Sequence, residues 1–307
     1  MQKPTFDPGL TQQVTGTLRR AIEKDGSFNV KRRGNTWKDV HPYLHLVSMS
    51  WTRFLAVLFV TFLVLNTIFA CGYYALGAEE LHSGIAASVG GEFMNDFFFS
   101  AQTLTTVGYG SIWPMGLGAN LLAALEAMCG LMGFALATSL LYGRVSRPSA
   151  RISYSENLAV APYMDGTSLQ FRVVNRRQNS IMELEVTMVL MDVEGPAGNL
   201  KRVYKPLKLE RDKVLFFPVT WTLVHPIDQD SPLFGKTAED LERLQSEFMI
   251  LIKGYDDTFN QTVHSRYSYR YDEVVWGARF APAFHIDAGG DIIVEVNKVG
   301  ELMRVQI

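Results

Sequence analysis

Residues 97–110 read FFFSAQTLTTVGYG, and this stretch decides how the first half of the chain folds. Its first ten or so residues are mostly apolar and could form ~15 Å of helix, half the thickness of a bilayer core. The last five, TVGYG at 106–110, contain Gly108 and Gly110, which can adopt backbone angles closed to other residues. A helix that stops at mid-membrane leaves irregular backbone there, which is tolerated only inside protein or beside a watery cavity. The stretch therefore predicts a re-entrant loop that lines a pore.

The segments on either side predict two membrane-spanning helices. The chain is 48% hydrophobic, an ordinary value, but no lysine or arginine occurs between Arg53 and Arg144. Within this interval residues 54–78 carry no charge and residues 117–143 carry only Glu126, so each run exceeds the roughly 20 residues that a spanning helix needs. We therefore expect a transmembrane pore domain at 50–148, with a first span at about 50–78, a pore helix at about 95–106, a filter at 106–110 and a second span at about 117–146.

Charges on the flanks predict the orientation. The basic residues are Lys31, Arg32, Arg33, Lys38 and Arg53 before the first span, and Arg144, Arg147 and Arg151 after the second. The segment between the spans has only acidic charges, at Glu79, Glu80, Glu92 and Asp96. Because basic residues stay on the cytoplasmic side of a membrane, we expect both termini in the cytoplasm. No signal peptide is expected, since the first apolar run lies too far into the chain and is too long.

The chain before the first span divides into an arm and a short helix. Residues 1–36 are polar and lack a sustained apolar period, so we expect a loosely ordered cytoplasmic arm. From Trp37 onward, apolar residues recur at steps of three or four, which predicts an amphipathic helix over 37–49 at the membrane surface. The alternative is a frayed start of the spanning helix, and Pro42 favours a break between the two.

Residues 149–307 predict a β-sandwich. Apolar residues alternate in 168–174 and in 181–190, where one face would carry Met182, Leu184, Val186, Met188 and Leu190. Further apolar runs occupy 214–224, 248–252 and 292–296, a hairpin turn is expected at Asp165-Gly166, and one helix is expected at 237–246. Many short strands separated by turns are typical of a sandwich of roughly 150 residues.

No motif favours an enzyme. The six histidines are dispersed, and the sequence has no Cys/His cluster at zinc spacing, no GxSxG and no phosphate-binding loop. A net charge of −2 without a basic domain argues against nucleic acid as a partner. We therefore expect no catalytic residues, no enzymatic activity and no cofactor. An arginine-repeat helix is also missing, so no voltage sensor is expected.

The pentapeptide at 106–110 has the chemistry of a cation filter. Its glycines allow successive carbonyl oxygens to point to one axis, and the Thr106 hydroxyl can add a further ring of oxygens. Val107 and Tyr109 would point away from the axis and pack behind it. The pentapeptide is similar to the filter that potassium channels share, which implies potassium ions held by Thr106, Val107, Gly108 and Tyr109. One chain supplies a quarter of each oxygen ring, so four copies are required.

Longer motifs are more specific than the filter. They are FFFSAQTLTTVGYG at 97–110, LEAMCGLMGFALATSLLYGRVSRP at 125–148, TWTLVHPIDQDSPLFG at 220–235 and VHSRYSYRYDEVVWGARF at 263–280. With these motifs the chain resembles the bacterial branch of the inward-rectifier potassium channels, called KirBac, over nearly all of residues 37–280. The resemblance implies a membrane α-helical pore domain with two transmembrane helices, followed by an all-β, immunoglobulin-like cytoplasmic sandwich. It also implies a homotetramer in the bacterial inner membrane, a slide helix at the membrane surface, and conduction of potassium.

The resemblance also implies roles for particular residues. The pore-facing line of the second span would be Phe134, Thr138 and Tyr142, with Tyr142 at the constriction, although an aromatic residue could also pack against the outer helix. Gly130 and Gly133 match the place where the family bends, but small residues equally allow close helix packing. Glu183 and Asp257 match acids that draw cations into the cytoplasmic vestibule. Because relatives that rectify strongly carry an acid where this chain has Phe134, strong block by internal polyamines is not expected.

Two polar residues are expected to support the filter. Gln102 stands where many relatives have a glutamate, and no arginine follows Gly110 as a partner. Glu126 is the one ionisable residue in either span, and we expect it near the filter, in contact with backbone or hydroxyl groups. Arg144, Arg147 and Arg151 lie at the inner headgroup level and are expected to meet anionic lipids, although setting the topology is a sufficient role for them.

Two alternatives to a selective channel remain at this point. One is a membrane-anchored cytoplasmic binding module whose pore does not conduct, and the other is a weakly selective cation channel. The intact filter at 106–110 argues against the second.

Overall fold

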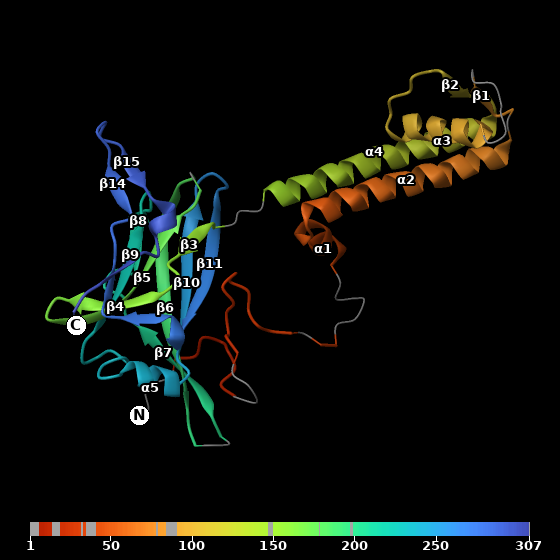
Figure 1. Ribbon diagram of the computed structural model, residues 1–307. Coiled ribbons are helices and arrows are strands. Elements are labelled where there is room, and N and C mark those ends of the chain that lie inside the picture. The colour runs from red at the N-terminus through yellow and green to blue at the C-terminus, as the bar shows by residue number, and fades with distance from the viewer. Residues whose placement is uncertain are drawn as a thin grey trace. The chain divides into compact units, whose positions relative to one another are not determined.

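The computed structural model describes residues 6–13, 19–31, 33–34, 41–77, 79–83, 91–146, 150–177, 179–196 and 199–306. The chain forms two compact units, one made of Arg32–Arg147 and the other of Met1–Lys31 together with Pro148–Ile307 (Figure 1). We call the first the pore unit and the second the β unit, and each is described by itself. Arg147, position 78 and residues 37–40 of the expected surface helix lie outside the described residues.

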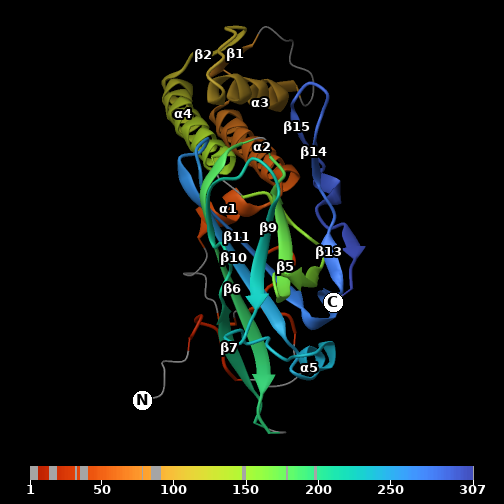
Figure 2. The same ribbon diagram turned by 90° about the vertical axis from the view of Figure 1, so that its left-hand side faces the viewer.

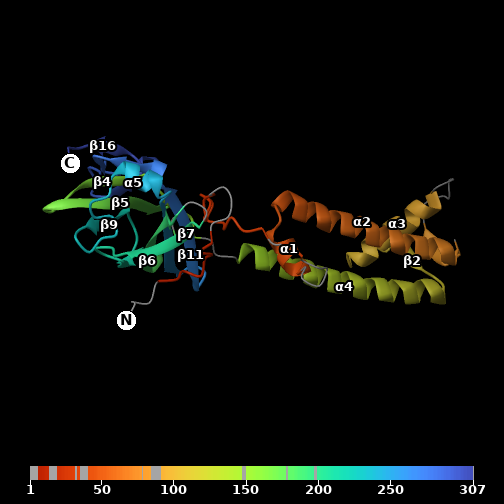
Figure 3. The ribbon, with the colours of Figure 1, turned by 90° about the horizontal axis from the view of Figure 1, so that it is seen from below.

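The pore unit is helical. Its helices are α1 (Pro42–Ser48), α2 (Trp51–Leu76), α3 (Gly91–Leu104) and α4 (Leu117–Val145), and its one small sheet pairs β1 (Leu81–Ser83) with β2 (Ile112–Pro114). Helices α2 and α4 lie side by side, and α3 packs against both (Figures 1 and 3). Among the described residues, α2 and α4 are the two helices that are long and apolar enough to cross a membrane.

Two helix boundaries differ from those expected. Helix α3 begins at Gly91 rather than at about 95, because Glu92 favours the positive end of the helix dipole in its first turn. It ends at Leu104, since Thr106 has a φ of 59° that no helix can continue. The expected break between the surface helix and the first span is present, and it lies at Met49. Pro42 itself begins α1, where its missing N–H costs nothing.

The β unit is a sandwich of two five-stranded sheets that pack around one core (Figure 2). One sheet contains β11 (Gln261–Arg270), β10 (Glu247–Asp256), β6 (Ile181–Glu194), β7 (Lys201–Leu207) and β8 (Lys213–Phe216). The other contains β12 (Val274–Trp276), β4 (Leu158–Tyr163), β5 (Gly166–Asn175), β3 (Ile152–Tyr154) and β9 (Trp221–Ile227). Phe171, Leu223, Phe248 and Tyr269 are fully buried between the sheets.

The remaining elements of the β unit are short. They are α5 (Ala238–Arg243), two 3-10 turns (Tyr271–Glu273 and Val296–Lys298), and the strand pairs β13 (Ala278–Phe280) with β16 (Leu302–Arg304) and β14 (Phe284–Ile286) with β15 (Ile292–Val294). The helix expected at 237–246 is shorter than predicted. Thr237 caps it by accepting a hydrogen bond from the Asp240 amide, which fixes where α5 begins.

A bulge in β6 overturns the expected alternation. Ile181 is 1% exposed and belongs to the core together with Leu184, whereas Met182 lies outside it. Glu183 between them has a φ of 51°, and the register with β10 shifts between Lys253 and Tyr255. One extra residue reverses which side chains face inward, so the predicted face is wrong at this end of the strand.

The hairpin turn between β4 and β5 lies one residue earlier than predicted. Tyr163 pairs directly with Gly166, so Met164 and Asp165 form the two-residue loop. Met164 has a φ of 49°, as two-residue hairpin loops require. Gly166 therefore belongs to the strand rather than to the turn.

Part of the amino-terminal arm is fixed to the β unit, which contradicts the expected loose order. The buried carboxylate of Glu247 accepts hydrogen bonds from the backbone amides of Ala21 and Ile22, at 2.9–3.3 Å. The Ile22 side chain is 5% exposed, and Lys24 pairs with Glu273 at 2.6 Å. Apolar periodicity could not predict this, because the segment is held by backbone hydrogen bonds, one buried apolar side chain and an ion pair rather than by a repeating apolar face.

Candidate functional site

The filter loop has an alternating backbone. Thr106, Gly108 and Gly110 have φ angles of 59°, 56° and 77°, while Val107 and Tyr109 between them do not have positive φ. In an extended strand successive carbonyl groups point to opposite sides of the chain. When left-handed and ordinary backbone conformations alternate, every second peptide plane is turned over, so successive carbonyl groups point to the same side. Two of the three left-handed positions are glycine, where this conformation costs little.

Gln102 holds the amide side of the loop. Its backbone carbonyl accepts from the amides of Val107 at 2.9 Å and Gly108 at 3.3 Å. Its side-chain oxygen accepts from the Tyr109 amide at 3.2 Å, and its side-chain nitrogen donates to the Ile112 carbonyl at 2.9 Å. Gln102 is 7% exposed, so these bonds are shielded from solvent. One residue of the pore helix therefore fixes both ends of the loop.

The carbonyl oxygens of the loop are left free. Among the described residues, no hydrogen bond ends on a carbonyl oxygen of residues 106–110. Helix α3 ends at Leu104, so the negative end of its dipole also lies next to the start of the loop. A row of unpaired carbonyl oxygens beside a helix C-terminus is suited to binding cations that have shed water.

The side chains of Val107 and Tyr109 line a cavity behind the loop. Its volume is about 410 Å³, and its other walls include Phe62, Phe98 and Gln102. In the single chain Tyr109 is 81% exposed. The packing expected behind the filter is therefore incomplete within one copy.

A buried polar network lies behind the pore helix and ties three helices together. Tyr73 on α2 donates a hydrogen bond to one carboxyl oxygen of Glu126 at 2.7 Å, and Ser100 on α3 contacts the other. The Ser100 hydroxyl also lies 3.0 Å from the side-chain oxygen of Asn66. Asn66, Ser100 and Glu126 have no exposed surface, and Tyr73 is 1% exposed. Glu126 thus meets two hydroxyl groups, one of them on the pore helix α3, and its role as a support of the filter stays a prediction.

The two glycines of α4 have different surroundings. A Cβ atom added to Gly130 would lie 2.0 Å from the carbonyl oxygen of Leu104, the last residue of α3. A Cβ atom added to Gly133 would meet nothing within 4 Å. Gly130 therefore allows α4 to touch the end of the pore helix, whereas Gly133 has no such close contact, and a hinge at either glycine stays a prediction. Helix α4 is continuous through both positions.

Phe134, Thr138 and Tyr142 lie on one exposed face of α4. Phe134 and Tyr142 are each 74% exposed, and the Thr138 hydroxyl donates to the Phe134 carbonyl at 2.9 Å. Among the described residues the Tyr142 ring is mostly uncovered, so it is not packed against the outer helix. The spacing of four thus places the three residues on one face of α4, and the pore-lining role of this face stays a prediction.

Arg144 contacts protein rather than standing free. Its guanidinium donates to the carbonyls of Leu46, Val47 and Met49, at 2.7–3.0 Å, at the C-terminal end of α1. It also stacks over the Trp51 ring, 4.7 Å from its centroid. Sequence reasoning missed this role, because nothing near Arg144 in the sequence indicates α1 as a partner. Arg151 is exposed, whereas Arg147 lies outside the described residues.

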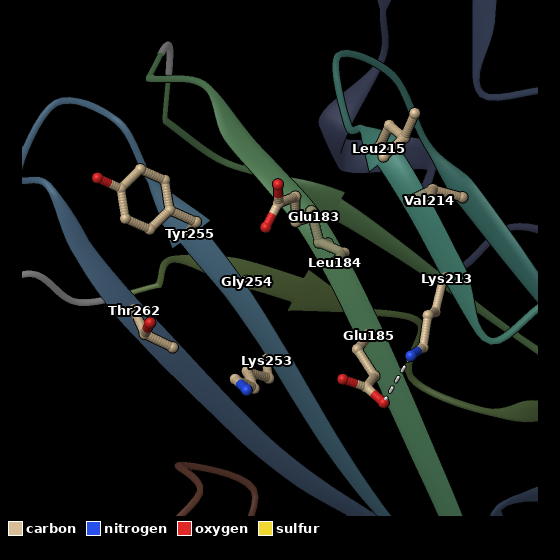
Figure 4. A pocket seen from close by; sticks show the side chains of 10 residues that line it. All are labelled: Glu183, Leu184, Glu185, Lys213, Val214, Leu215, Lys253, Gly254, Tyr255 and Thr262. Atoms are coloured by element: carbon tan, nitrogen blue, oxygen red, sulfur yellow. Dashed lines mark ion pairs between the residues drawn. The ribbon is translucent and has the colours of Figure 1, made fainter.

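Glu183 lies in a groove of the β unit, which Figure 4 shows. The groove has a volume of about 440 Å³ and crosses β8, β6, β10 and β11. Besides Glu183 it is lined by Glu185, Lys213, Lys253, Tyr255 and Thr262, among others, and Glu185 pairs with Lys213 at 3.2 Å. The two lysines were not anticipated, so this surface is of mixed charge rather than acidic.

Asp257 lies at the same end of this sheet as Glu183. It follows directly on β10, where Asp256 is in register with Ile181, and its side chain is exposed. Asp256 is instead fully buried and accepts hydrogen bonds from Asn179 and from the amide of Thr258. The structure thus brings the two predicted acids to the same end of this sheet.

Two spanning helices that enclose a half-helix and a loop of free carbonyl oxygens define the pore-forming subunit of an ion channel. Comparison with known proteins agrees in both units. Residues 43–147 match the family model described as "Ion channel", and residues 152–307 match "Inward rectifier potassium channel C-terminal domain". The chain therefore belongs to the inward rectifier potassium channel family, a family of ion channels and not of enzymes.

Individual relatives give the same family. The chain is 37% identical over 289 residues to the inward rectifier potassium channel Kirbac3.1 of Paramagnetospirillum magnetotacticum, covering 93% of this chain and 96% of that protein. It is 25% identical to the human G protein-activated inward rectifier potassium channel 1 and 28% identical to the mouse G protein-activated inward rectifier potassium channel 3. Each of these matches covers 94% of this chain, but 62% of the human protein and 79% of the mouse protein.

Proposed function

We propose that four copies of this chain surround one pore that conducts potassium passively through the loop at 106–110. The observation that carries the proposal is the row of carbonyl oxygens without hydrogen-bond partners, whose amides are held by Gln102. Membership in an inward rectifier potassium channel family makes potassium the permeant ion. Rings of four carbonyls from Thr106, Val107, Gly108 and Tyr109 replace the water around the ion.

The incomplete cavity behind the filter supports a closed ring of copies. Val107 and Tyr109 need apolar cover, and a neighbouring copy supplies it in a fourfold arrangement. In such a ring the exposed face of α4 turns to the pore axis, and Tyr142 forms the constriction near the cytoplasm. Glu183 and Asp257 then face the ion path inside the cytoplasmic domain, and Lys253 reduces the negative potential there.

Membrane lipids act on the gate through the surface helix α1. The side chains that meet anionic headgroups are those of Arg147 and Arg151, because Arg144 is engaged by the carbonyls of α1. Arg144 couples α1 to the end of α4 that carries Tyr142, so a shift of α1 moves the constriction. The membrane is the inner membrane of a bacterium, with both termini in the cytoplasm.

Tracer uptake into liposomes tests the proposal. We expect purified tetramer in liposomes that contain anionic lipid to take up rubidium when the potassium concentration is higher inside than outside, because the outward potassium gradient drives the uptake. Protein-free liposomes should take up none. Gly110→Asp is the matched control: nothing lies within 4 Å of the added Cβ, so the chain still folds, but a carboxylate at a φ of 77° disrupts the filter. Rubidium uptake by the wild-type tetramer together with its loss in Gly110→Asp supports the channel. Absence of uptake by the assembled wild-type tetramer in every lipid mixture favours a membrane-anchored module that does not conduct.

A further inference from the structure

The network around Glu126 has fewer hydrogen-bond donors than acceptors at the Ser100 hydroxyl. The Asn66 side-chain nitrogen donates to the Phe62 carbonyl at 2.7 Å, which fixes the orientation of the amide and points its oxygen toward Ser100. The Ser100 hydroxyl therefore faces two acceptors, the Asn66 oxygen and one carboxyl oxygen of Glu126. Ser100 has a single hydrogen to donate. With an ionised Glu126, one of these two fully buried oxygens has no donor among the residues that the structure describes.

A proton on Glu126 removes the shortfall. The acid then donates to the Ser100 oxygen, Ser100 donates to the Asn66 oxygen, and Asn66 donates to the Phe62 carbonyl. Tyr73 donates to the second oxygen of Glu126, at 2.7 Å. Each of these contacts then joins one donor to one acceptor, and neither buried oxygen beside Ser100 lacks a donor, as expected in a fully buried network.

The surroundings of Glu126 agree with a neutral acid. No lysine or arginine occurs between Arg53 and Arg144, so a carboxylate at this depth has no cation to pair with. Glu126 is fully buried, and its partners are a phenol and an alcohol rather than charged groups. An isolated ionised carboxylate in such a place is costly, whereas a protonated acid that both donates and accepts is not.

We propose that Glu126 carries a proton and heads a chain of hydrogen bonds through Ser100 and Asn66 that clamps the pore helix between α2 and α4. Ser100 lies on α3 two residues before Gln102, so the clamp holds the same helix that orients the filter loop. Glu126 is in this sense a positioning residue for selective conduction. The protonation itself does not rest on the proposed function, because it concerns the folded pore unit whether or not it conducts.

Infrared spectroscopy of the wild-type tetramer reads the proton directly. A protonated carboxyl group has a carbonyl stretch well separated from that of a carboxylate, and it shifts in deuterium oxide if the proton exchanges. The difference spectrum between wild type and Glu126→Gln is expected to contain one such band. Glu92→Gln is the matched control, because Glu92 is an exposed glutamate in the first turn of α3 and its loss must not remove the band. A wild-type minus Glu126→Gln spectrum that shows only a lost carboxylate overturns the proposal.

Substitutions at the same position give an independent readout. The amide of Glu126→Gln can donate to Ser100 and accept from Tyr73, as a protonated acid does, so this variant is expected to keep tetramer stability and selectivity near those of wild type. Glu126→Leu makes neither bond and is expected to lower the midpoint of thermal tetramer dissociation by roughly 5 °C or more. If Glu126→Gln is as damaging as Glu126→Leu, or fails to assemble where wild type assembles, the acid is ionised and the proposal is wrong.

Discussion

The side-chain oxygen of Gln102 accepts a hydrogen bond from the backbone amide of Tyr109 at 3.2 Å, which ties the pore helix to the outer half of the filter loop. The nitrogen of the same side chain donates to the Ile112 carbonyl at 2.9 Å, just beyond the loop. A neutral side-chain amide can do both, because it has one acceptor oxygen and two donor hydrogens. The filter of this chain is therefore supported without the glutamate and arginine pair expected in many relatives.

Replacing Gln102 tests this support. Gln102→Leu leaves the Tyr109 amide and the Ile112 carbonyl without partners, and each buried group left unpaired costs about 1–3 kcal/mol. We expect the ratio of potassium to sodium permeability to fall by about tenfold or more, as measured from reversal potentials in bilayers. Gln102→Glu keeps the acceptor for Tyr109 and loses only the donor to Ile112, so it should fall between wild type and the leucine variant. An unchanged ratio in Gln102→Leu would contradict the role assigned to this residue.

The two glycines of α4 allow close packing to be distinguished from hinge bending. Gly130→Ala places a methyl group 2.0 Å from the Leu104 carbonyl, so α3 and α4 must move apart. We expect a loss of about 1–3 kcal/mol in stability and poorer tetramer assembly, as measured by thermal dissociation on a native gel. Gly133→Ala meets nothing within 4 Å and should assemble normally. If Gly133 is a hinge, this second variant changes the open probability without changing stability, and equal stability of both variants would refute the packing account of Gly130.

Arg144 is expected to hold α1 in place. Hydrogen bonds to a charged group contribute about 1.5–3 kcal/mol each, so Arg144→Ala should speed hydrogen exchange at the backbone amides of residues 43–48 by about tenfold or more. The exchange rate in Arg144→Lys should lie between those of wild type and Arg144→Ala, because an ammonium group cannot bond to the Leu46 and Met49 carbonyls at the same time as the two guanidinium nitrogens do. Arg53→Ala is the control, since Arg53 is an exposed arginine in the first turn of α2. Unaltered hydrogen exchange in Arg144→Ala would contradict the claim that Arg144 holds α1 and would favour the lipid-binding role predicted from the sequence.

Burial of His225 is expected to make the free energy of unfolding depend on pH. Its Nδ1 donates to the Lys208 carbonyl at 2.6 Å, so its Nε2 accepts from the Ser231 hydroxyl at 2.8 Å, and the ring is 3% exposed. Burial lowers the pKa of His225 below 6.5, although the bond to Lys208 and the charge of Asp228 oppose the shift. The unfolded chain therefore binds a proton more readily than the folded one.

The sign of the effect follows from that difference. Stability is full above pH 6.5 and falls as the pH drops from there toward the lower pKa of the folded state, because protons then favour the unfolded chain. We expect the unfolding midpoint of the detergent-solubilised protein, followed by circular dichroism, to be lower at about pH 5 than at about pH 7.5. His225→Gln should flatten the dependence in this window, whereas a replacement of the exposed His264 should not. An equal slope in the two variants would exclude His225 as its source.

Local patterns predicted the parts of the site that depend on neighbouring residues in the chain. The two spans, the half-helix and the filter are each written in one continuous stretch, so hydropathy and glycine spacing were enough to predict them. Glu126 could be named as a support because an ionisable residue within a span needs a partner, whereas Gln102 was named from the family resemblance, as the residue that replaces a glutamate. Which partners they have could not be predicted, since Tyr73 and Ile112 come from other elements.

The features that the sequence did not predict all depend on backbone geometry or on contacts between segments far apart in the chain. The bulge at Glu183 reverses the alternation in β6 through one backbone angle, which no apolar pattern records. Glu247 captures the amino-terminal segment through backbone amides, which every residue except proline has, so composition carries no sign of the contact. Arg144 turns to the carbonyls of α1 because folding brings the end of one helix to the end of another.

Competition for rubidium uptake measures most directly whether the carbonyl oxygens of residues 106–110 select potassium. The wild-type tetramer is placed in liposomes, and unlabelled potassium or sodium is added outside together with the tracer. We predict that potassium equal in concentration to rubidium reduces tracer uptake by about half, whereas sodium in roughly tenfold excess leaves it unchanged. Inhibition by sodium as strong as that by potassium would contradict the assignment of the filter.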